Sequence, residues 1–563
     1  MSDISSPIRP SVAEVRDAGR TTVLIVGGGI NGISTFRDLA LQGVDVTLVE
    51  RGDFASGASS ASSHMVHGGI RYLENGEFRL VRESVQERNR LLKLAPHFVK
   101  PLETTIPIYS TFSGIMSAPL RFLTHKQGKP KERGAALIKI GLMIYDTFSR
   151  DGGSVPRHRF HGRRKSLAAL PDLDPDVKYT ATYYDASMHD PERLALDVLL
   201  DGSAAHEGAR AVNYVEAIGS TADGVLLRDN VSGEEFSVAA DVVVNASGTW
   251  TDMTNAQLGR ETAFMGGTKG SHIVLDHPEL LAATKGRELF FEHSDGRIVL
   301  IYPLKDRVMV GTTDIDVKPT DDVTCTDEEI DYFFDLVHHV FPQIAVDRSQ
   351  IVYSFSGIRP LPRHGDTAPG FVSRDYRIEV DDSRSTPIVS LVGGKWTTFR
   401  AIGENLADTV LGLLGRTRTA STAGLAIGGG RAFPLGAQET QAWKRAHLSG
   451  AGHRADGLFV RYGTRAADVW SYVEEGEDRE LAGGALSTRE LSWMVEREHA
   501  VHLRDVVLRR TSLAFTGDAS DAVLEEIADA LAEIAGWRAE TRDAELEQAR
   551  GELHAKHSVP ATV

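Results

Sequence analysis

The fold of this chain is decided by the stretch Thr22-Val-Leu-Ile-Val-Gly-Gly-Gly-Ile-Asn-Gly-Ile-Ser34. An apolar run leads directly into Gly27-x-Gly29-x-x-Gly32, and a helical pattern follows. The first glycine permits a tight turn, the second lets the backbone approach a pyrophosphate, and the third lets the helix pack on the strand. The helix N-terminus presents N–H groups and partial positive charge to the anion. The stretch therefore predicts the phosphate-binding turn of a dinucleotide-binding domain.

A second apolar run, Asp45–Val49, supports this interpretation. It ends in Glu50, 18 residues after Gly32, where an acidic side chain can accept hydrogen bonds from an adenosine ribose. Together with Thr22–Val26, the run predicts one right-handed βαβ unit.

Five more strand-like runs lie far apart in the sequence. They are Asp241–Asn245, Ile298–Tyr302, Arg307–Thr312, Ile351–Phe355 and Ile388–Val392. Their separation predicts an α/β fold in which the nucleotide-binding domain is discontinuous and a substrate domain is inserted into it.

The last quarter of the chain predicts helices. From about Ala437 the sequence is charged and rich in Ala and Glu. The apolar face of one predicted helix is made by Val523, Ile527, Leu531 and Ile534. Asp518 or Ser520 is expected to cap that helix, and Thr417–Ala432 is expected to be a linker.

Length and composition predict a soluble cytoplasmic protein of two or three domains, since 563 residues exceed one ordinary core. The net charge of −16 disfavours nucleic acid as a partner. Cys325 is the single cysteine, which fits a reducing cytosol, and we expect it to be a small buried hydrophobe. Met1–Arg20 lacks the apolar core of a signal peptide, and no apolar run reaches transmembrane length. No spacing of His, Cys and carboxylates indicates a metal site.

One segment, residues 119–165, departs from the acidic average with 12 Lys and Arg against 3 Asp and Glu. It contains the short apolar run Ala135–Tyr145. This pattern is typical of a surface that binds anionic lipid, which predicts peripheral contact with a membrane. A solvated basic face beside an anionic substrate channel explains the composition equally well.

Small hydroxyl residues follow Glu50 and end in a dense polar group. The segment Ser56–Leu73 includes Ser59, Ser60 and Ser63. Its polar end comprises His67, Gly68, Gly69, Arg71 and Tyr72. Such a segment can lie against a flat ring and hydrogen-bond to it, which favours a deeply buried flavin over a nicotinamide.

Late glycines and cations complete the predicted site. In Leu391–Arg400 a strand ends at Gly393 and Gly394, and the helix that follows would direct its positive end and Lys395 at the flavin pyrimidine. Arg359 is suited to grip a phosphate with two hydrogen bonds. Arg71, Arg359, Arg374 and Lys395 together predict an anion site. The runs Lys269–Val274 and Val310–Asp314 would place His272 and Thr312 near the ring.

Taken together, and in their order along the chain, these sequence clusters resemble those of the FAD-dependent glycerol-3-phosphate dehydrogenase family. The resemblance rests on Gly27–Gly32, Ser59–Ser63, His67–Glu74, Glu77–Val81, Lys269–Val274, Gly311–Asp314, Tyr353–Leu361 and Gly393–Arg400. It is close over residues 20–400 and looser over the helical part. The chain departs from the family pattern at His64, where Lys is common, at Ser247 in Asn245-Ala-Ser-Gly248, and at Trp396.

The resemblance implies an enzyme that oxidises sn-glycerol 3-phosphate to dihydroxyacetone phosphate by hydride transfer to FAD. Electrons would then pass to membrane quinone, with the protein bound peripherally to the inner face of the cytoplasmic membrane; a homodimer is compatible with the sequence. Three alternatives stay open: oxygen as acceptor, as in a glycerol-3-phosphate oxidase, a related flavin amine oxidase, and an FAD-bearing scaffold without turnover.

The resemblance also implies a domain division. The discontinuous Rossmann-type FAD-binding domain would comprise residues 20–110, 185–260 and 350–416. An inserted antiparallel-sheet substrate domain would comprise 111–184 and 261–349, and an all-α C-terminal domain 433–555. Residues 1–19 and 556–563 are expected to be flexible tails.

The expected roles fall into two groups. Arg359 would bind the phosphate, assisted by Arg71, Tyr72, Arg374 and Thr312. Lys395 would stabilise negative charge on the substrate oxygen or on reduced flavin, and His67 and His272 compete as the base, with His67 slightly favoured. The residues expected to bind FAD are Gly27, Gly29, Asn31, Gly32, Glu50, Ser59, Ser60, Ser63, His67, Gly68, Gly69, Gly248, Gly394, Lys395, Thr397 and Thr398.

Overall fold

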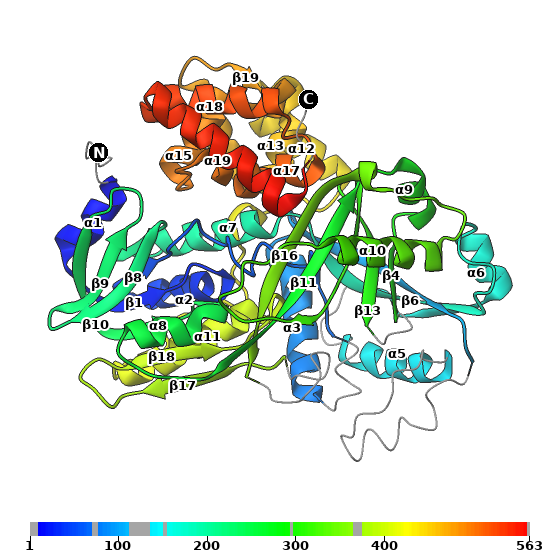
Figure 1. The fold of residues 1–563 in the computed structure, drawn as a ribbon, viewed down its shortest axis with the longest axis horizontal. Helices are drawn as coiled ribbons and strands as arrows, with labels where there is room; N and C mark the ends of the chain where they lie inside the picture. The colour runs from blue at the N-terminus through cyan, green and yellow to red at the C-terminus, as the bar shows by residue number, and fades with distance from the viewer. Residues whose placement is uncertain are drawn as a thin grey trace.

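The first strand, β1 (Arg20–Val26), lies inside a mostly parallel sheet of eight strands in the computed structural model (Figure 1). The structure describes residues 9–69, 77–111, 135–149, 155–292, 297–363 and 374–559. The main strand order is β17 (Arg377–Asp381), β18 (Ile388–Val392), β10 (Glu235–Asn245), β1, β2 (Val46–Val49) and β7 (Ala209–Val212). A hairpin of β8 (Val215–Thr221) and β9 (Gly224–Asp229) extends from β10.

The predicted βαβ unit is present. β1 and β2 are parallel, with Val23 opposite Val46, and α2 (Ile30–Leu41) connects them. α2 packs against α7 (Pro191–Ser203) and α11 (Phe399–Leu413). Both faces of this sheet are covered, which is why β1 and β2 are almost continuously apolar.

The second sheet has ten strands and is mostly antiparallel. Its main order is β15 (Ile315–Asp316), β11 (Met265–Leu275), β14 (Arg307–Gly311), β13 (Ile298–Leu304), β12 (Glu288–Glu292), β4 (Val99–Ile108), β6 (Tyr179–Met188) and β3 (Met65–Val66). β16 (Ile351–Pro362) pairs with β11, and β5 (Arg159–Gly162) with β6. The helices α9 (Pro278–Thr284) and α10 (Asp327–Val340) pack on this sheet through an apolar core.

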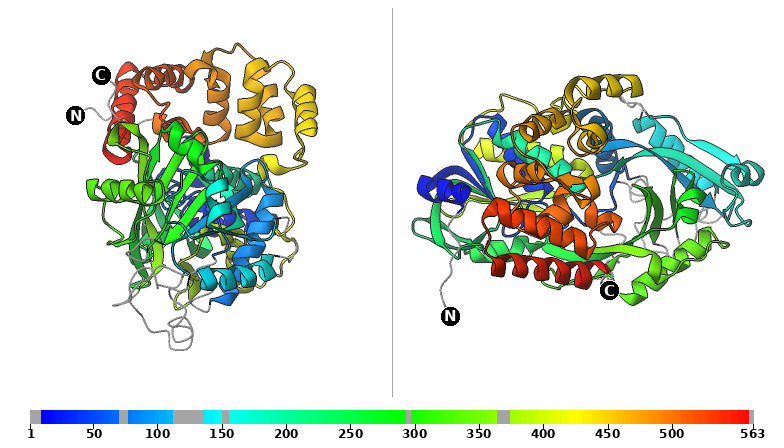
Figure 2. Two further views of the ribbon diagram at one scale, coloured as in Figure 1. Left: turned by 90° about the vertical axis from the view of Figure 1, so that its right-hand side faces the viewer. Right: turned by 90° about the horizontal axis from the view of Figure 1, so that it is seen from above.

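The C-terminal part is a helical domain that lies over α7 and one end of both sheets (Figures 1 and 2). Its longer helices are α12 (Ala437–His447), α13 (Ala455–Tyr462), α14 (Ala466–Glu474), α15 (Thr488–Arg497), α18 (Asp521–Ala535) and α19 (Ala539–His557). Ser520, rather than Asp518, caps α18 through the Val523 N–H. Ile527 and Leu531 on the predicted face are fully buried, and Val523 and Ile534 are partly buried.

Four predictions need correction. Residues 10–18 are not a tail but α1 (Pro10–Ala18), since Val12 and Val15 are buried in a core. Lys556 and His557 belong to α19 rather than to a tail. β4 and β16, which the predicted boundaries place in the FAD-binding domain, pair in the ten-stranded sheet instead, because their partners are distant in sequence. Cys325 is only half-buried, although burial still raises the pKa of its thiol to about 12.

Part of the basic segment forms α5 (Ala135–Ser149). Leu142 and Tyr145 are buried, whereas Ile140, Met143 and Ile144 face solvent. Residues 112–134 and 150–154 of this region lie outside the described residues. Within the part of the chain that the structure describes, no helix has both the length and the apolar character that crossing a bilayer requires.

Candidate active site

The glycine-rich turn has the close contacts that the sequence predicts. Gly27 has a φ of +114°, and a Cβ atom there would lie 2.6 Å from the carbonyl oxygen of Ala246. A Cβ atom at Gly32 would lie 2.0 Å from the carbonyl oxygen of Gly27. Gly29 caps α2, so the helix begins beside the turn and directs its positive end there.

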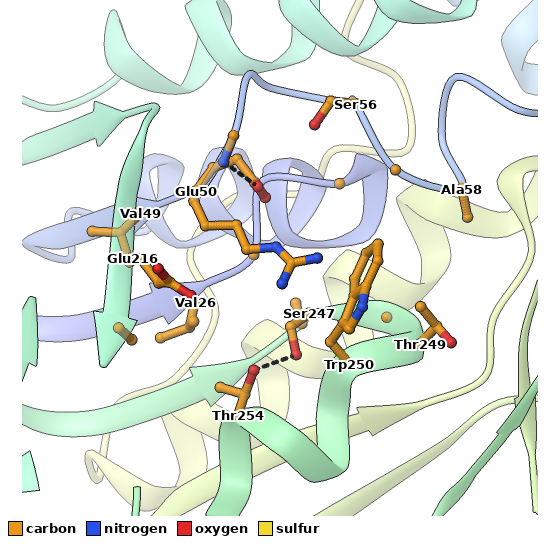
Figure 3. Close-up of a pocket in the computed structure, with 18 of the residues that line it drawn as sticks. Val26, Val49, Glu50, Ser56, Ala58, Glu216, Ser247, Thr249, Trp250 and Thr254 are labelled. Carbon is orange, nitrogen blue, oxygen red and sulfur yellow. Dashed lines mark hydrogen bonds between the residues drawn. The ribbon is translucent and has the colours of Figure 1, made fainter. Parts of the chain in front are cut away.

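A cavity of about 430 Å³ opens from this turn (Figure 3). Glu50 and Ser56 lie on one side, and Ser247 and Trp250 on another. Further lining residues are Val26, Val49, Arg51, Gly52, Val215, Glu216, Ala217, Gly248 and Thr249. The volume is within the range typical of small-molecule and cofactor sites.

Glu50 is fixed by two backbone N–H groups. Its Oε2 accepts from Gly28 at 2.7 Å, and its Oε1 accepts from Gly52 at 2.9 Å. Burial raises the pKa of Glu50, and these two N–H groups counteract that shift. Each carboxylate oxygen retains a lone pair for a ribose hydroxyl, because a carboxylate offers about four acceptor sites. Glu50 therefore lies in the wall of the cavity, and its contact with a ribose stays a prediction.

Sequence reasoning missed the opposite wall of this cavity. Val215–Ala217 come from β8, which lacks a strong apolar run, and Trp250 follows Gly248 in the short helix η2 (Gly248–Trp250). The Arg51 guanidinium lies 4.1 Å from the centre of the Trp250 ring. Gly248, which is expected from the sequence to bind FAD, is the predicted residue of this segment, and its φ is +63°.

The early hydroxyl-rich segment and the late glycine turn contact each other. The Trp396 Nε1–H donates to the carbonyl oxygen of Ser59 at 2.9 Å, and the Thr397 hydroxyl to that of His67 at 3.4 Å. The Ser59 hydroxyl accepts from the Ile30 N–H at 3.0 Å. The Ser60 hydroxyl donates to the carbonyl oxygen of Gly57 at 3.0 Å. The predicted flavin-binding segments are thus neighbours.

Asn31 and Gly394 meet at the junction of these segments. A Cβ atom at Gly394 would lie 3.0 Å from Asn31 Nδ2. Asn31 Oδ1 is buried and has no hydrogen-bond partner among the described residues. Lys395 begins the short helix η5 (Trp396–Thr398), and the Thr398 hydroxyl donates to its carbonyl oxygen at 3.5 Å.

A buried polar network fixes the backbone after His67. The Gly68 N–H donates to Asp185 Oδ1 and to the Tyr145 hydroxyl, both at 3.1 Å. Arg88, fully buried on α3 (Phe78–Leu94), donates to the same two groups at 2.8 Å. Sequence reasoning missed these residues, because three distant segments supply them. Gly69, the last described residue of the segment, also has a positive φ, of +76°.

Of the two candidate bases, His272 is buried and His67 is half-buried. Burial lowers the pKa of His67 to about 3, and Lys395, Arg374 and Arg88 add to the effect. Burial also lowers the pKa of His272 well below its ordinary value, with contributions from Arg359 and His64. Both imidazoles are therefore neutral near pH 7 and able to accept a proton.

Ser63 and Phe355 hold the His272 ring. The Ser63 hydroxyl lies 2.8 Å from His272 Nε2, and the Phe355 ring stacks on the imidazole with centres 4.7 Å apart. A Cβ atom at Gly311 would lie 2.2 Å from His272 Cδ2, so this glycine leaves room for the ring.

Two of the four predicted anion-binding side chains, Arg359 and Arg374, meet at Asp314. Arg359 donates to the Thr312 hydroxyl at 2.8 Å and to Asp314 Oδ1 at 3.1 Å. Arg374 donates to Asp314 Oδ2 at 3.2 Å. The Lys395 ammonium donates to the Ser84 hydroxyl at 3.1 Å. Arg374 and Lys395 lie close enough to His67 to lower its pKa, and Arg359 lies close enough to His272 to lower its pKa. Arg71 and Tyr72 lie outside the described residues.

Comparisons with known proteins identify the family of this chain. A family model described as FAD dependent oxidoreductase matches residues 22–409, and one described as C-terminal domain of alpha-glycerophosphate oxidase matches residues 420–542. A glycerol-3-phosphate dehydrogenase of Synechocystis sp. is 34% identical over 93% of this chain and 95% of its own. The chain belongs to the FAD-dependent glycerol-3-phosphate dehydrogenase family.

One relative is named for a different substrate. A D-erythritol 1-phosphate dehydrogenase of Brucella abortus is 31% identical over 87% of this chain and 93% of its own. The structure of a glycerol-3-phosphate dehydrogenase from Bacillus halodurans complexed with FAD has the same fold, with a TM-score of 0.74, 24% identity and 96% coverage of both chains. The resemblance and the fold class predicted from the sequence are confirmed.

FAD is the cofactor of this family, and the described residues fit it. The cavity beside Glu50 suits an adenosine, the turn before α2 suits a pyrophosphate, and the unpartnered Asn31 Oδ1 faces the region between the turn and the flavin-binding segments. The prediction of FAD is confirmed. The roles of single residues stay predictions.

Proposed function

We propose that this protein oxidises sn-glycerol 3-phosphate to dihydroxyacetone phosphate and passes the electrons to membrane quinone. The proposal is carried by one observation: Arg359 and Arg374 meet at Asp314, and Arg374 and Lys395 lie close enough to His67, and Arg359 to His272, to lower the pKa values of these histidines. A phosphorylated alcohol needs both a cationic anchor and a base, whereas an amino-acid substrate would not need several cations. Several relatives are glycerol-3-phosphate dehydrogenases, which supports the same substrate.

Arg359 binds the phosphate in this proposal. Thr312 and Asp314 hold its guanidinium in one orientation, which preorganises its positive charge for phosphate oxygens. Arg374 contributes charge from the other side of Asp314. Arg71 and Tyr72 remain proposed helpers.

The reaction removes a hydride and a proton from one carbinol group. FAD, when bound, supplies the hydride acceptor. A neutral His67 or His272 takes the hydroxyl proton, and Lys395 stabilises the negative charge that develops on the substrate oxygen. A bound dianion raises the proton affinity of either histidine, because it offsets the cations that depress their pKa values.

Single-turnover flavin reduction distinguishes the two bases. In His67→Gln and His272→Gln, loss of the base is expected to slow flavin reduction about 100-fold or more. If a histidine contributes only packing, its variant is expected to reduce the flavin at a rate near that of the wild type. If neither variant slows reduction, both histidines lose the role of base.

Anaerobic titration of the purified yellow protein tests the proposed substrate. Glycerol 3-phosphate is expected to bleach the flavin, while glycine, sarcosine and D-amino acids leave it oxidised. D-erythritol 1-phosphate is the necessary competitor, since one relative carries that name. Bleaching by the erythritol ester alone would overturn the substrate assignment. Subsequent reoxidation by a soluble quinone or by air separates the dehydrogenase from the oxidase.

We also propose that α5 binds the cytoplasmic face of an anionic membrane. Its exposed apolar residues Ile140, Met143 and Ile144 lie within the basic segment 119–165. Flotation with vesicles of anionic lipid tests this. The variant Ile140→Glu/Met143→Glu is expected to lose flotation, and Val460→Glu, at an equally exposed site on α13, to retain it. Flotation that is unchanged in the double variant contradicts the proposal.

A further inference from the structure

The C-terminal domain reaches the loop that carries Glu50. Asp53 is completely buried, and its carboxylate accepts from two consecutive arginines of the π-helical turn η10 (Val506–Arg510). Arg509 Nε donates to Oδ2 at 2.5 Å, and Arg510 donates through Nη1 to Oδ2 at 2.7 Å and through Nη2 to Oδ1 at 2.9 Å. Burial alone would raise the pKa of Asp53, but the two guanidinium groups outweigh it and lower that pKa.

Asp53 is one residue from the cavity wall. Gly52 lines the cavity, and its N–H holds Glu50 Oε1, while Glu50 Oε2 holds Gly28 of the phosphate-binding turn. A continuous series of hydrogen bonds and one covalent step therefore connects Arg510 to the turn before α2. The carboxylate expected to bind the ribose depends on this series for its position.

The C-terminal domain also supports the opposite wall of the cavity. Asn213 donates through Nδ2 to Asp53 Oδ1 at 2.9 Å and to the carbonyl oxygen of His499 at 2.8 Å. The Tyr214 hydroxyl donates to Asp505 Oδ1 at 2.5 Å, and the Tyr214 N–H to the carbonyl oxygen of Gly52 at 2.8 Å. Tyr214 has a φ of +58°, which is unfavourable for a bulky side chain and is retained only where contacts enforce it. The next residues, 215–217, line the cavity.

Other ion pairs attach the same domain elsewhere. Arg465 donates to Asp197 Oδ1 at 2.6 Å and to Asp201 Oδ1 at 3.1 Å, both on α7. Neither aspartate lines the cavity. These contacts attach the domain without touching the cavity. The Asp53 cluster differs from them because it adjoins both cavity walls; it comprises Asp53, Asn213, Asp505, Arg509 and Arg510.

We propose that Arg509 and Arg510 are positioning residues for the adenosine half of FAD. The docked C-terminal domain holds the two cavity walls in the geometry that binds the cofactor. By linkage, adenosine binding stabilises the docked Asp53 cluster by the same factor. The C-terminal domain is thus a structural part of the cofactor site rather than an appended module.

Cofactor affinity of the full-length protein, stripped of flavin, tests the proposal. Arg510→Lys keeps the charge but loses the two-pronged contact, and Asp53→Asn keeps the shape but loses the charge. Both are expected to weaken FAD and ADP about 10-fold or more. ADP is the informative probe because it fills only the adenosine and phosphate subsites. The matched control, Arg465→Lys, is expected to bind both ligands within about twofold of wild type, since the remaining contacts keep the domain docked. Wild-type affinity in both cluster variants would overturn the proposal.

Hydrogen exchange of the wild-type protein covers the case in which the variants fail to fold. ADP added to the flavin-free protein is expected to slow exchange in residues 499–511 and to leave α12 unchanged. Unchanged exchange in residues 499–511 at saturating ADP would show that the two sites are not coupled. Neither measurement depends on the identity of the oxidised substrate.

Discussion

Arg359 reaches its position because its neighbours both hold it and leave room for it. The Thr312 hydroxyl and Asp314 accept its hydrogen bonds. A Cβ atom on Gly270, in the adjacent strand, would lie only 2.0 Å from its Nη2. The guanidinium therefore has one fixed orientation, with its charge next to His272.

Replacement of this side chain should affect substrate binding more than cofactor binding. Arg359→Ala is expected to raise KM for glycerol 3-phosphate about 10- to 100-fold, from the loss of roughly 1.5–3 kcal/mol in charge-assisted hydrogen bonds. The bound flavin spectrum should persist. Steady-state kinetics check this, with Arg348→Ala as control, because Arg348 is an exposed arginine that pairs with Asp327 and Asp331. An unchanged KM would remove Arg359 from the phosphate site.

At the scale of elements, the pairing of β11 with β16 builds this part of the site. Gly270 lies opposite Gly357, two residues from Arg359 along β16. The flexible end of the arginine is the group that an added methyl at Gly270 would displace. A small residue on one strand thus determines where a charged group on its neighbour lies.

Gly270→Ala should reproduce part of the Arg359→Ala effect while keeping the arginine. We expect KM for glycerol 3-phosphate to rise about 10-fold, since displacing the guanidinium costs about one charge-assisted hydrogen bond. Kinetics and thermal unfolding measured together check this. Gly457→Ala, at an open position on α13, controls for the loss of a glycine. A large fall in stability with unchanged KM in the folded fraction would contradict the expectation.

The sequence predicts elements better than it predicts how they meet. All seven predicted strand runs correspond to strands. Strands of the parallel sheet and of the centre of the second sheet are buried, so their sequences are nearly continuous apolar runs that are easy to recognise. β4 and β6 were missed, since polar residues such as Glu103 and Asp185 interrupt their patterns. Asp185 binds Arg88 across 97 positions. Contacts of that kind depend on packing of distant segments, which no local pattern encodes.

At the scale of the whole molecule, buried ionisable groups predict an optimum of stability. Six buried or half-buried histidines have lowered pKa values: His64, His67, His189, His272, His499 and His557. Below pH 6.5 the unfolded chain protonates these histidines and the native state does not, so stability falls as the pH falls. Burial raises the pKa of Glu192 and Glu288 to about 8. Their effect on stability has the opposite sign. Above the ordinary glutamate pKa the unfolded chain loses these protons and the native state keeps them, so stability falls as the pH rises toward 8.

Thermal unfolding from pH 4.5 to 8.5 should therefore show a maximum near pH 6.5. Each histidine removes up to about 1.4 kcal/mol of stability per pH unit on the acid side, and each glutamate removes the same on the alkaline side. Between pH 4.5 and 6.5 the six histidines make stability rise with pH and the two glutamates make it fall, so the net slope of stability against pH is positive. His64→Gln should flatten the acid limb and Glu288→Gln the alkaline limb, because Glu288 Oε1 is buried with no partner among the described residues and suits a protonated carboxyl. His447→Gln, at an exposed site on α12, should change neither limb. A curve that keeps both slopes in all three variants would place the pH dependence in other groups.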